Sequence, residues 1–163
     1  MNILILCTGN SARSILLESI FMRLGGGRVR AFSAGSMPVG AVHPEALALL
    51  RQKSYPCKGL RSKSWDEFAT PDAPHMDMVI TVCGNAKGES CPRWPGAPLR
   101  GHWGIGDPAQ ITGSPAATKA AFRVAFDVLE ARAKAWLALD FERMDSDERQ
   151  HHINRIGAAS LVM

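Results

Sequence analysis

The feature that most constrains this chain is an apolar run that leads through a short polar loop directly into a helical pattern. Asn2–Leu6 is typical of a buried strand, and Ser14–Phe21 has the spacing of an amphipathic helix. The seven-residue loop Cys7–Arg13 lies between them, so the chain passes from the end of a strand into a helix N-terminus. This arrangement predicts the first strand–helix unit of an α/β fold.

The composition of the loop indicates that it binds an oxyanion. Backbone N–H groups point into such a turn, and the helix dipole favours negative charge there. Cys7 supplies a nucleophile, and the Arg13 guanidinium can donate two hydrogen bonds to the oxyanion. Ser14 is placed to orient the Cys7 thiolate. We expect this positive field to lower the pKa of Cys7. The plainer alternative is that Cys7 is a small buried hydrophobe. If the loop does bind an oxyanion, the backbone N–H groups that contact it would be those of Thr8, Gly9, Asn10, Ser11 and Ala12.

Composition limits the class of protein. A chain of 163 residues, 46% of them hydrophobic, suits one domain with a real core. No apolar run approaches the about 18 residues of a membrane span, and the short apolar start lacks the basic residues of a secretion signal. We therefore expect a cytoplasmic protein with reduced thiols. The net charge of +4 suits an anionic ligand, and the basic residues are too scattered to predict nucleic-acid binding.

Strand and helix patterns alternate along the chain, which predicts a four-stranded parallel sheet with helices on both faces. We assign this single domain to residues 1–139 and a C-terminal extension to 140–163, in which Asp145–Glu148 has the composition of a helix start. A long Gly- and Pro-rich segment, 83–101, is predicted to be an irregular functional loop. The remaining patterns predict strands over 28–34 and 76–82, helices over 44–51 and 64–68, and a long helix that begins after Ser114 and reaches Leu137.

The predicted parallel sheet places two further cysteines, Cys83 and Cys91, near the loop. Ligands of parallel sheets bind beyond the carboxyl ends of the strands, where Cys7 and Cys83 both fall. Cys91 lies in the irregular segment, and its spacing from Cys83 lacks the second pair that a zinc site needs, so we expect no metal. Reducible cysteines beside a nucleophile suggest a thiol relay. The alternative is two unpaired loop cysteines, and Cys57 has no assigned role.

At these residues the chain resembles the low-molecular-weight protein tyrosine phosphatase fold. The run Cys-Thr-Gly-Asn-Ser-x-Arg-Ser is similar to the arsenate reductase branch of that fold in particular. The resemblance covers about residues 1 to 138. It implies a reductase that converts arsenate to arsenite in arsenic detoxification. Three further stretches match in order: Ser33–Gly35, Val82–Pro92 with its two cysteines, and His102–Gly104 followed by Asp107-Pro108.

The resemblance also implies roles for single residues. Cys7 attacks arsenate, Cys83 attacks Cys7, and Cys91 then attacks Cys83. Asp107 acts as general acid toward the leaving oxygen, although an Asp-Pro turn is also common without any catalytic role. No bound cofactor is implied. The expected partners are arsenate, phosphate or sulfate as competing oxyanions, and an external reductant, either thioredoxin or glutaredoxin with glutathione.

Some members of the family hold potassium behind the loop with an Asn, a Glu, a Ser and an Asp. Asn10, Glu18 and Ser33 match three of these, and Lys63 stands at the position of the Asp. The resemblance therefore implies that the Lys63 ammonium takes the place of the cation and holds Glu18 and Asn10. The alternative is a solvated lysine in a basic turn.

Two other functions remain open from the sequence. A phosphatase of this fold typically has aromatic residues after Asp-Pro and needs neither Cys83 nor Cys91, whereas Ala109-Gln110 follow here. A reductase is favoured, with weak phosphatase activity, because a thiol can reduce As(V) while a phosphoryl-cysteine can only be hydrolysed. The second alternative, of another class, is a non-catalytic oxyanion-binding redox sensor.

Overall fold

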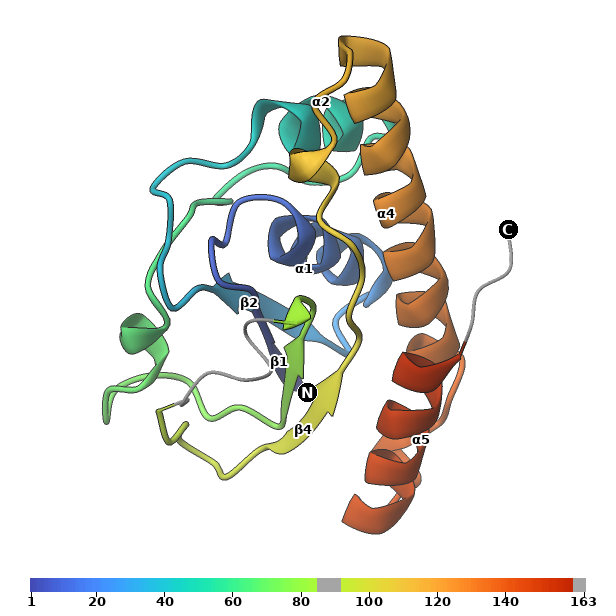
Figure 1. The fold of residues 1–163 in the computed structure, drawn as a ribbon. Coiled ribbons are helices and arrows are strands. Elements are labelled where there is room, and N and C mark those ends of the chain that lie inside the picture. Colours follow the sequence, from blue (N-terminus) through green and yellow to red (C-terminus); the bar gives the residue numbers. More distant parts are fainter. Residues whose placement is uncertain (85–91, 160–163) are drawn as a thin grey trace.

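The structure is a computed structural model that describes residues 1–84 and 92–159. Its centre is one parallel sheet of four strands, as the sequence predicts, and the structure shows the strand order β2-β1-β3-β4 (Figure 1). The strands are β1 (Asn2–Leu6), β2 (Arg30–Ala34), β3 (Met78–Thr81) and β4 (Leu99–His102). The helices are α1 (Arg13–Leu24), α2 (Pro44–Gln52), α4 (Pro115–Leu137) and α5 (Ser146–Ala158), with the short 3₁₀ helices η1 (Trp65–Phe68), η2 (Pro108–Gln110) and η3 (Phe141–Arg143).

The sheet is buried on both faces because its central strands, β1 and β3, are apolar at every position except Asn2 and Thr81. Ile3 and Ile5 of β1 belong to the larger hydrophobic cluster, together with residues of α1, α2, α4 and α5. Leu4 and Leu6 point to the opposite face and belong to a smaller cluster. This alternation follows from the two-residue period of a strand, and a continuous apolar run is what a parallel central strand requires.

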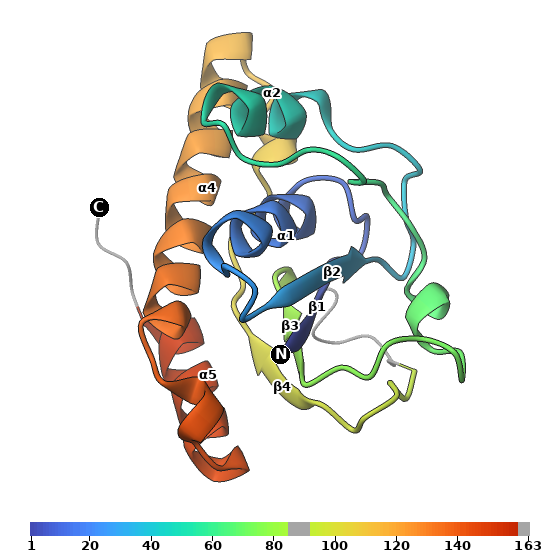
Figure 2. The same ribbon diagram turned by 180° about the vertical axis from the view of Figure 1, so that it is seen from behind.

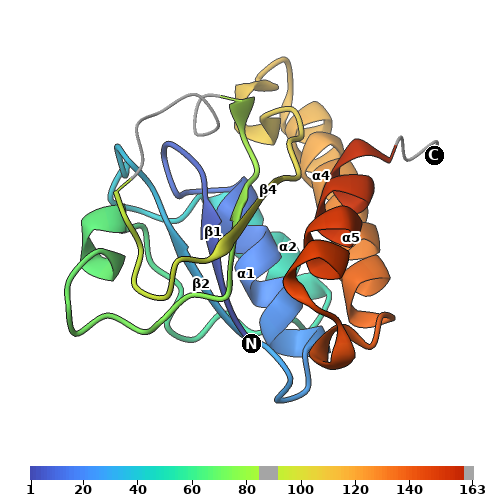
Figure 3. The same cartoon turned by 90° about the horizontal axis from the view of Figure 1, so that it is seen from below.

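Helices cover the two faces unequally. On one face α1 lies between the sheet and the long α4, and α5 lies along the lower part of α4 and against β4 (Figures 1 and 2). On the other face the smaller cluster is closed by η1 and a following loop. There Phe68 is buried, and the rings of Trp65 and Trp94 meet edge to face with centroids 6.0 Å apart. Figure 3, seen from below, shows α1, α4 and α5 on the same side of the sheet.

The helix starts predicted from the sequence are confirmed by their capping contacts. The Ser114 side chain accepts a hydrogen bond from the N–H of Ala117, and Pro115 occupies the first helical position of α4. Asp145 and Glu148 form a capping box at the start of α5, in which each side chain accepts from the other residue's backbone N–H. The extension therefore contains a helix with its own start signal.

The fourth strand lies where the sequence predicted irregular structure. Residues 99–101 belong to the segment predicted as loop, yet Leu99–His102 pairs in parallel with Met78–Thr81. The strand contains a glycine and shows no apolar alternation, because it is an edge strand with one sheet neighbour. Gly101 has a packing reason, since a Cβ built there would lie 2.1 Å from Cγ2 of Ile153 on α5. β2 and β3 are also shorter than predicted.

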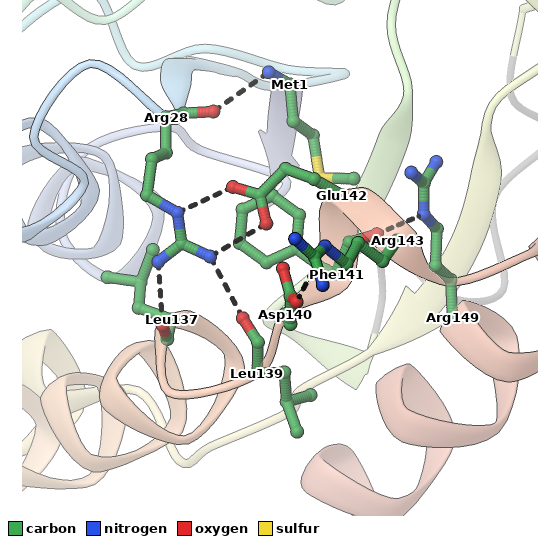
Figure 4. A network of polar contacts seen from close by, with 9 residues as sticks. All are labelled: Met1, Arg28, Leu137, Leu139, Asp140, Phe141, Glu142, Arg143 and Arg149. Carbon is green, nitrogen blue, oxygen red and sulfur yellow. Dashed lines mark hydrogen bonds and ion pairs between the residues drawn. The ribbon is translucent and has the colours of Figure 1, made fainter.

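A polar network ties the N-terminus and Arg28 to the link between α4 and α5 (Figure 4). The Arg28 guanidinium donates to the carbonyls of Leu137 and Leu139 over 2.8 and 2.9 Å and pairs with Glu142. It also lies 4.4 Å from the ring centroid of Phe141. The N-terminal ammonium donates to the Arg28 carbonyl over 2.9 Å. These contacts fix the link between α4 and α5 beside the start of β2.

Within the described residues, no helix combines the length and apolarity needed to cross a membrane.

Candidate active site

The loop Cys7–Arg13 is held with its carbonyl groups turned outward. The carbonyls of Thr8, Gly9 and Ser11 each accept a hydrogen bond of 3.0 to 3.1 Å from a neighbouring segment. The N–H groups of Asn10 to Arg13, by contrast, have no acceptor among the residues that the structure describes. An anion could therefore be bound by these donors, as the sequence predicted. The donors to the carbonyls are the N–H groups of Met37, Val39 and His43.

Asn10 fixes the shape of this loop from beneath. It is fully buried and has a φ of 45°, in the left-handed region that Asn tolerates better than most residues. Its Nδ2 donates to the hydroxyls of Ser14 and Ser33 over 2.8 and 3.0 Å. Its Oδ1 accepts from the backbone N–H of Lys63 over 2.9 Å. One side chain thus links the loop to α1, to β2 and to the segment before η1.

Two residues support the loop in ways that the sequence did not predict, although Gly35 lies in one of the stretches that carry the family resemblance. Gly35 allows close backbone contact, since a Cβ there would lie 2.4 Å from the carbonyl oxygen of Thr8. The Ser62 hydroxyl donates to the Gly9 carbonyl and accepts from the Gly40 N–H, both over 3.1 Å. A glycine at the end of the strand beside the loop was a usable signal for Gly35. Nothing in the sequence marks Ser62.

The structure brings Cys7 and Cys83 together, as expected from their places at strand ends. β1 and β3 are neighbours and pair in parallel with Leu6 opposite Thr81, so the residues beyond them lie level. Both cysteines are buried, and the Sγ of Cys83 accepts a hydrogen bond from the Thr8 N–H over 3.3 Å. The Cys83 thiol therefore contacts the loop that begins at Cys7.

The expected lowering of the Cys7 pKa is wrong for this arrangement. The pKa of Cys7 is raised, first by its hydrogen bond with Cys83 and then by burial, while Arg13 and the Gly9 N–H act in the opposite direction. The expectation took account of the positive field of the loop but not of a second thiol in contact with the first.

Arg13 and Asp107 meet at the mouth of the loop. Nη1 of Arg13 donates to the Ile105 carbonyl over 2.9 Å, and Nη2 lies 3.5 Å from the Asp107 carboxylate. The other carboxylate oxygen accepts from the Ala109 N–H and caps η2. Nε of Arg13 is buried and has no hydrogen-bond partner among the described residues. This donor remains for an oxyanion.

The other predicted site residues fall outside this cluster or outside the described part. Cys91 lies outside the described residues. Trp103 is fully buried, and its Nε1 donates to the Ile153 carbonyl over 3.0 Å, so it packs α5 against the sheet. His102 Nδ1 lies 2.7 Å from the Thr81 hydroxyl. The Cys57 thiol donates to the Tyr55 carbonyl over 3.7 Å.

Comparison with known proteins identifies this arrangement. The model of the family "low molecular weight phosphotyrosine protein phosphatase" matches residues 2–150. The chain belongs to this family. An arsenate reductase of Bacillus licheniformis is 34% identical over 130 residues, 79% of this chain and 89% of that protein. The Bacillus subtilis arsenate reductase is 32% identical over 129 residues, again 79% of this chain and 89% of that protein.

Solved structures show the same fold. One described as an arsenate reductase in the phosphate binding state has a TM-score of 0.67 at 25% identity and covers 84% of this chain and 96% of its own. The thioredoxin-dependent arsenate reductase of Corynebacterium glutamicum has a TM-score of 0.63 at 22% identity, with coverage of 87% and 63%.

Within this low molecular weight phosphatase family, the chain departs from the potassium-binding pattern at Lys63. Its ammonium donates to the Arg61 carbonyl over 3.0 Å and makes no hydrogen bond to Asn10 or Glu18, which corrects our expectation. Asn10 is held instead by the Lys63 backbone N–H, and Glu18 accepts from the Ser33 hydroxyl. The contact of the Lys63 ammonium with this group is electrostatic.

The pKa values of Glu18 and Lys63 reflect the electrostatic interaction between these two buried side chains. Burial raises the pKa of Glu18 and lowers that of Lys63, and the charge of each partner opposes the effect on the other. The oxygens of Asn10 and Ser33 already take part in hydrogen bonds, and the charge of Lys63 acts on Glu18. These residues do not fit a bound potassium ion.

Proposed function

We propose that this protein reduces arsenate to arsenite, with thiols as the electron donors. The observation that carries the proposal is the contact of a second thiol, Cys83, with the oxyanion loop that begins at Cys7. Hydrolysis of a phosphate ester needs one nucleophile, whereas reduction of As(V) needs two thiols that can join. The arsenate reductases among the relatives support the same assignment.

In the first step Cys7 gives up its proton, which passes to the Asp107 carboxylate, and the resulting thiolate attacks the arsenic atom. An S–As bond forms and the bond from arsenic to a hydroxyl group breaks. Asp107 protonates the leaving hydroxide, which departs as water. The N–H groups of the loop and Nε of Arg13 bind the remaining oxygens. Ser14 lies directly beneath the loop, where its hydroxyl accepts from Asn10, and we assign it the role of orienting Cys7 once the thiolate forms.

In the second step the Cys83 thiolate attacks Sγ of Cys7. A disulfide forms between the two cysteines, the S–As bond breaks, and its electron pair remains on arsenic, which is released as arsenite. The two electrons come from the two thiols. The Thr8 N–H stabilises the Cys83 thiolate through its hydrogen bond to Sγ.

In the third step Cys91 attacks Cys83, which moves the disulfide to these two residues and restores the Cys7 thiol. This step rests on the family resemblance. A dithiol protein such as thioredoxin, or glutaredoxin with glutathione, then reduces the disulfide. Since every step needs reduced thiols, we place the reaction in the cytoplasm, and we expect phosphate or sulfate to compete with arsenate for the loop.

The test is arsenite release by the wild type and by three serine variants, with each reductant system in turn. Cys7→Ser should lose turnover but keep oxyanion binding, because the N–H groups and Arg13 remain. Cys83→Ser should stop multiple turnover, and Cys91→Ser should accumulate a Cys7–Cys83 disulfide that mass mapping detects. Arsenite production by Cys7→Ser would overturn the proposal. Arsenate binding without a single turnover by the wild type would favour the redox sensor.

Reductant dependence distinguishes the two possible electron donors. Full activity of Cys91→Ser, with Cys7 capped by glutathione, would assign the glutathione route. Activity only with thioredoxin and an intact Cys91 would assign the three-cysteine relay.

A further inference from the structure

Arg132 is a charged residue on the buried side of α4. Only 8% of its surface is exposed, and its neighbours on this side of the helix, Leu129, Ala133 and Trp136, are fully buried. It forms no ion pair with any acidic residue that the structure describes. Nη1 donates to the Gly104 carbonyl over 3.1 Å, and Nε is buried without a partner among the described residues. Burial lowers its pKa, but a guanidinium remains charged.

The carbonyl that Arg132 holds belongs to the segment that carries Asp107. This segment runs from the end of β4 to η2. Its next carbonyl, that of Ile105, accepts from Arg13, and the Ile105 N–H donates to the Val82 carbonyl over 3.1 Å. Arg132 on α4 and Arg13 on α1 therefore hold two neighbouring carbonyls, those of Gly104 and Ile105. Asp107 follows two residues later.

Stability alone does not account for a guanidinium at this position. Burying a charge without an opposite charge is costly, and an apolar residue would continue the face formed by Leu129 and Trp136. What the guanidinium provides here is a hydrogen bond to a carbonyl of the Asp107 segment. A general acid requires accurate placement, since a displacement of about 1 Å can cost about 100-fold in rate.

We propose that Arg132 is a positioning residue, which fixes the segment 104–107 and thereby holds Asp107 against the oxyanion loop. The proposal rests on the function assigned above for its kinetic consequences, but the structural part stands independently. The side chain does not touch the substrate; it acts through Asp107. Loss of this hydrogen bond should therefore slow the first chemical step and leave oxyanion binding intact.

The kinetic test compares Arg132→Gln and Arg132→Lys with Asp107→Asn, the Arg132→Gln/Asp107→Asn double variant, and Arg123→Gln, an exposed position on the same helix. The readouts are single-turnover arsenite formation and the affinity for inorganic phosphate. Arg132→Gln should form arsenite in a single turnover about tenfold more slowly than the wild type. The double variant should be less than about twofold slower than Asp107→Asn alone. Phosphate affinity should stay within about twofold, and Arg132→Lys should recover part of the rate.

Amide hydrogen exchange gives a readout that needs no turnover. The Ile105 amide, which donates to the Val82 carbonyl, should exchange faster in Arg132→Gln than in Arg123→Gln, while the amides in the centre of α4 stay protected. Arg132→Lys serves if the Gln variant is poorly folded. Unchanged exchange of this segment, or an equal loss of rate with and without Asp107, would overturn the inference. If the wild type formed no arsenite, the proposed function would fail while the exchange comparison still decided the role of Arg132.

Discussion

The backbone N–H of Thr8 donates a hydrogen bond to the Sγ of Cys83 over 3.3 Å, so the thiol beyond β3 contacts the loop that follows β1. The parallel register of the two strands sets this contact, because Leu6 lies opposite Thr81. It gives the site two sulfur atoms, which disulfide formation requires, and it places beside Cys7 the group that most strongly raises its pKa.

Replacing Cys83 with alanine should lower the pKa of Cys7. In the wild type the pKa of Cys7 is raised, so the pH midpoint of its alkylation should lie above that of an ordinary thiol. Without the Cys83 hydrogen bond the alkylation midpoint should move to lower pH, and the rate at neutral pH should rise about tenfold for each pH unit of that movement. Iodoacetamide labelling of Cys7, followed by mass spectrometry, measures this. A Cys57→Ala control should keep the wild-type profile, and an unmoved midpoint in Cys83→Ala would contradict the assigned cause.

Wild-type activity should be the same in potassium and in sodium, because Lys63 brings a positive charge to the buried group of Glu18 and Asn10. Lys63→Asp removes that charge and adds an oxygen ligand, so it should introduce a potassium dependence. Initial rates in matched chloride salts measure the difference. Lys58→Asp, at an exposed position, is the charge-matched control. Strong potassium activation of the wild type would refute this role of Lys63.

Gly101→Ala should destabilise the fold by about 1–3 kcal/mol, because the added Cβ would lie 2.1 Å from Cγ2 of Ile153. Ile153→Ala removes that methyl group and should cost about 2–5 kcal/mol by itself. The double variant should lose clearly less than the sum of the two. Urea unfolding of all three measures the coupling. Gly113→Ala is the control, since no atom lies within 4 Å of its Cβ position. Additive losses would mean that α5 can move away from β4.

Aryl phosphates should be hydrolysed slowly, and inorganic phosphate or sulfate should inhibit both reactions. The loop recognises a tetrahedral oxyanion whatever its central atom. After Asp107-Pro108, however, Ala109 and Gln110 offer no aromatic surface for a substrate ring. Gln110→Tyr should raise kcat/KM for an aryl phosphate about fivefold through stacking. Hydrolysis and arsenite formation are measured on one preparation. Fast wild-type hydrolysis, with no arsenite from any reductant, would assign a phosphatase instead.

Local sequence determined much of this protein. Neighbouring residues alone fix a strand, a turn and a helix here, through the apolar run before Cys7, the glycine and arginine of the loop, and the amphipathic pattern after it. The caps at Ser114 and Asp145 are equally local, because a capping side chain bonds to backbone only three residues away. These features are visible in the order of residue types, and the structure confirms the strand, the helix and both caps.

Tertiary structure decided what depends on residues that are distant in the chain. The edge strand at Leu99 exists because β3 offers it a partner, and its own residues carry no strand pattern. The pKa of Cys7 depends on Cys83, a thiol on another strand end, and Lys63 reaches Asn10 through its backbone N–H rather than through its ammonium group. These properties depend on burial and on hydrogen bonds between segments that are distant in the chain. A local sequence pattern contains no information about either, because both arise only when the chain folds.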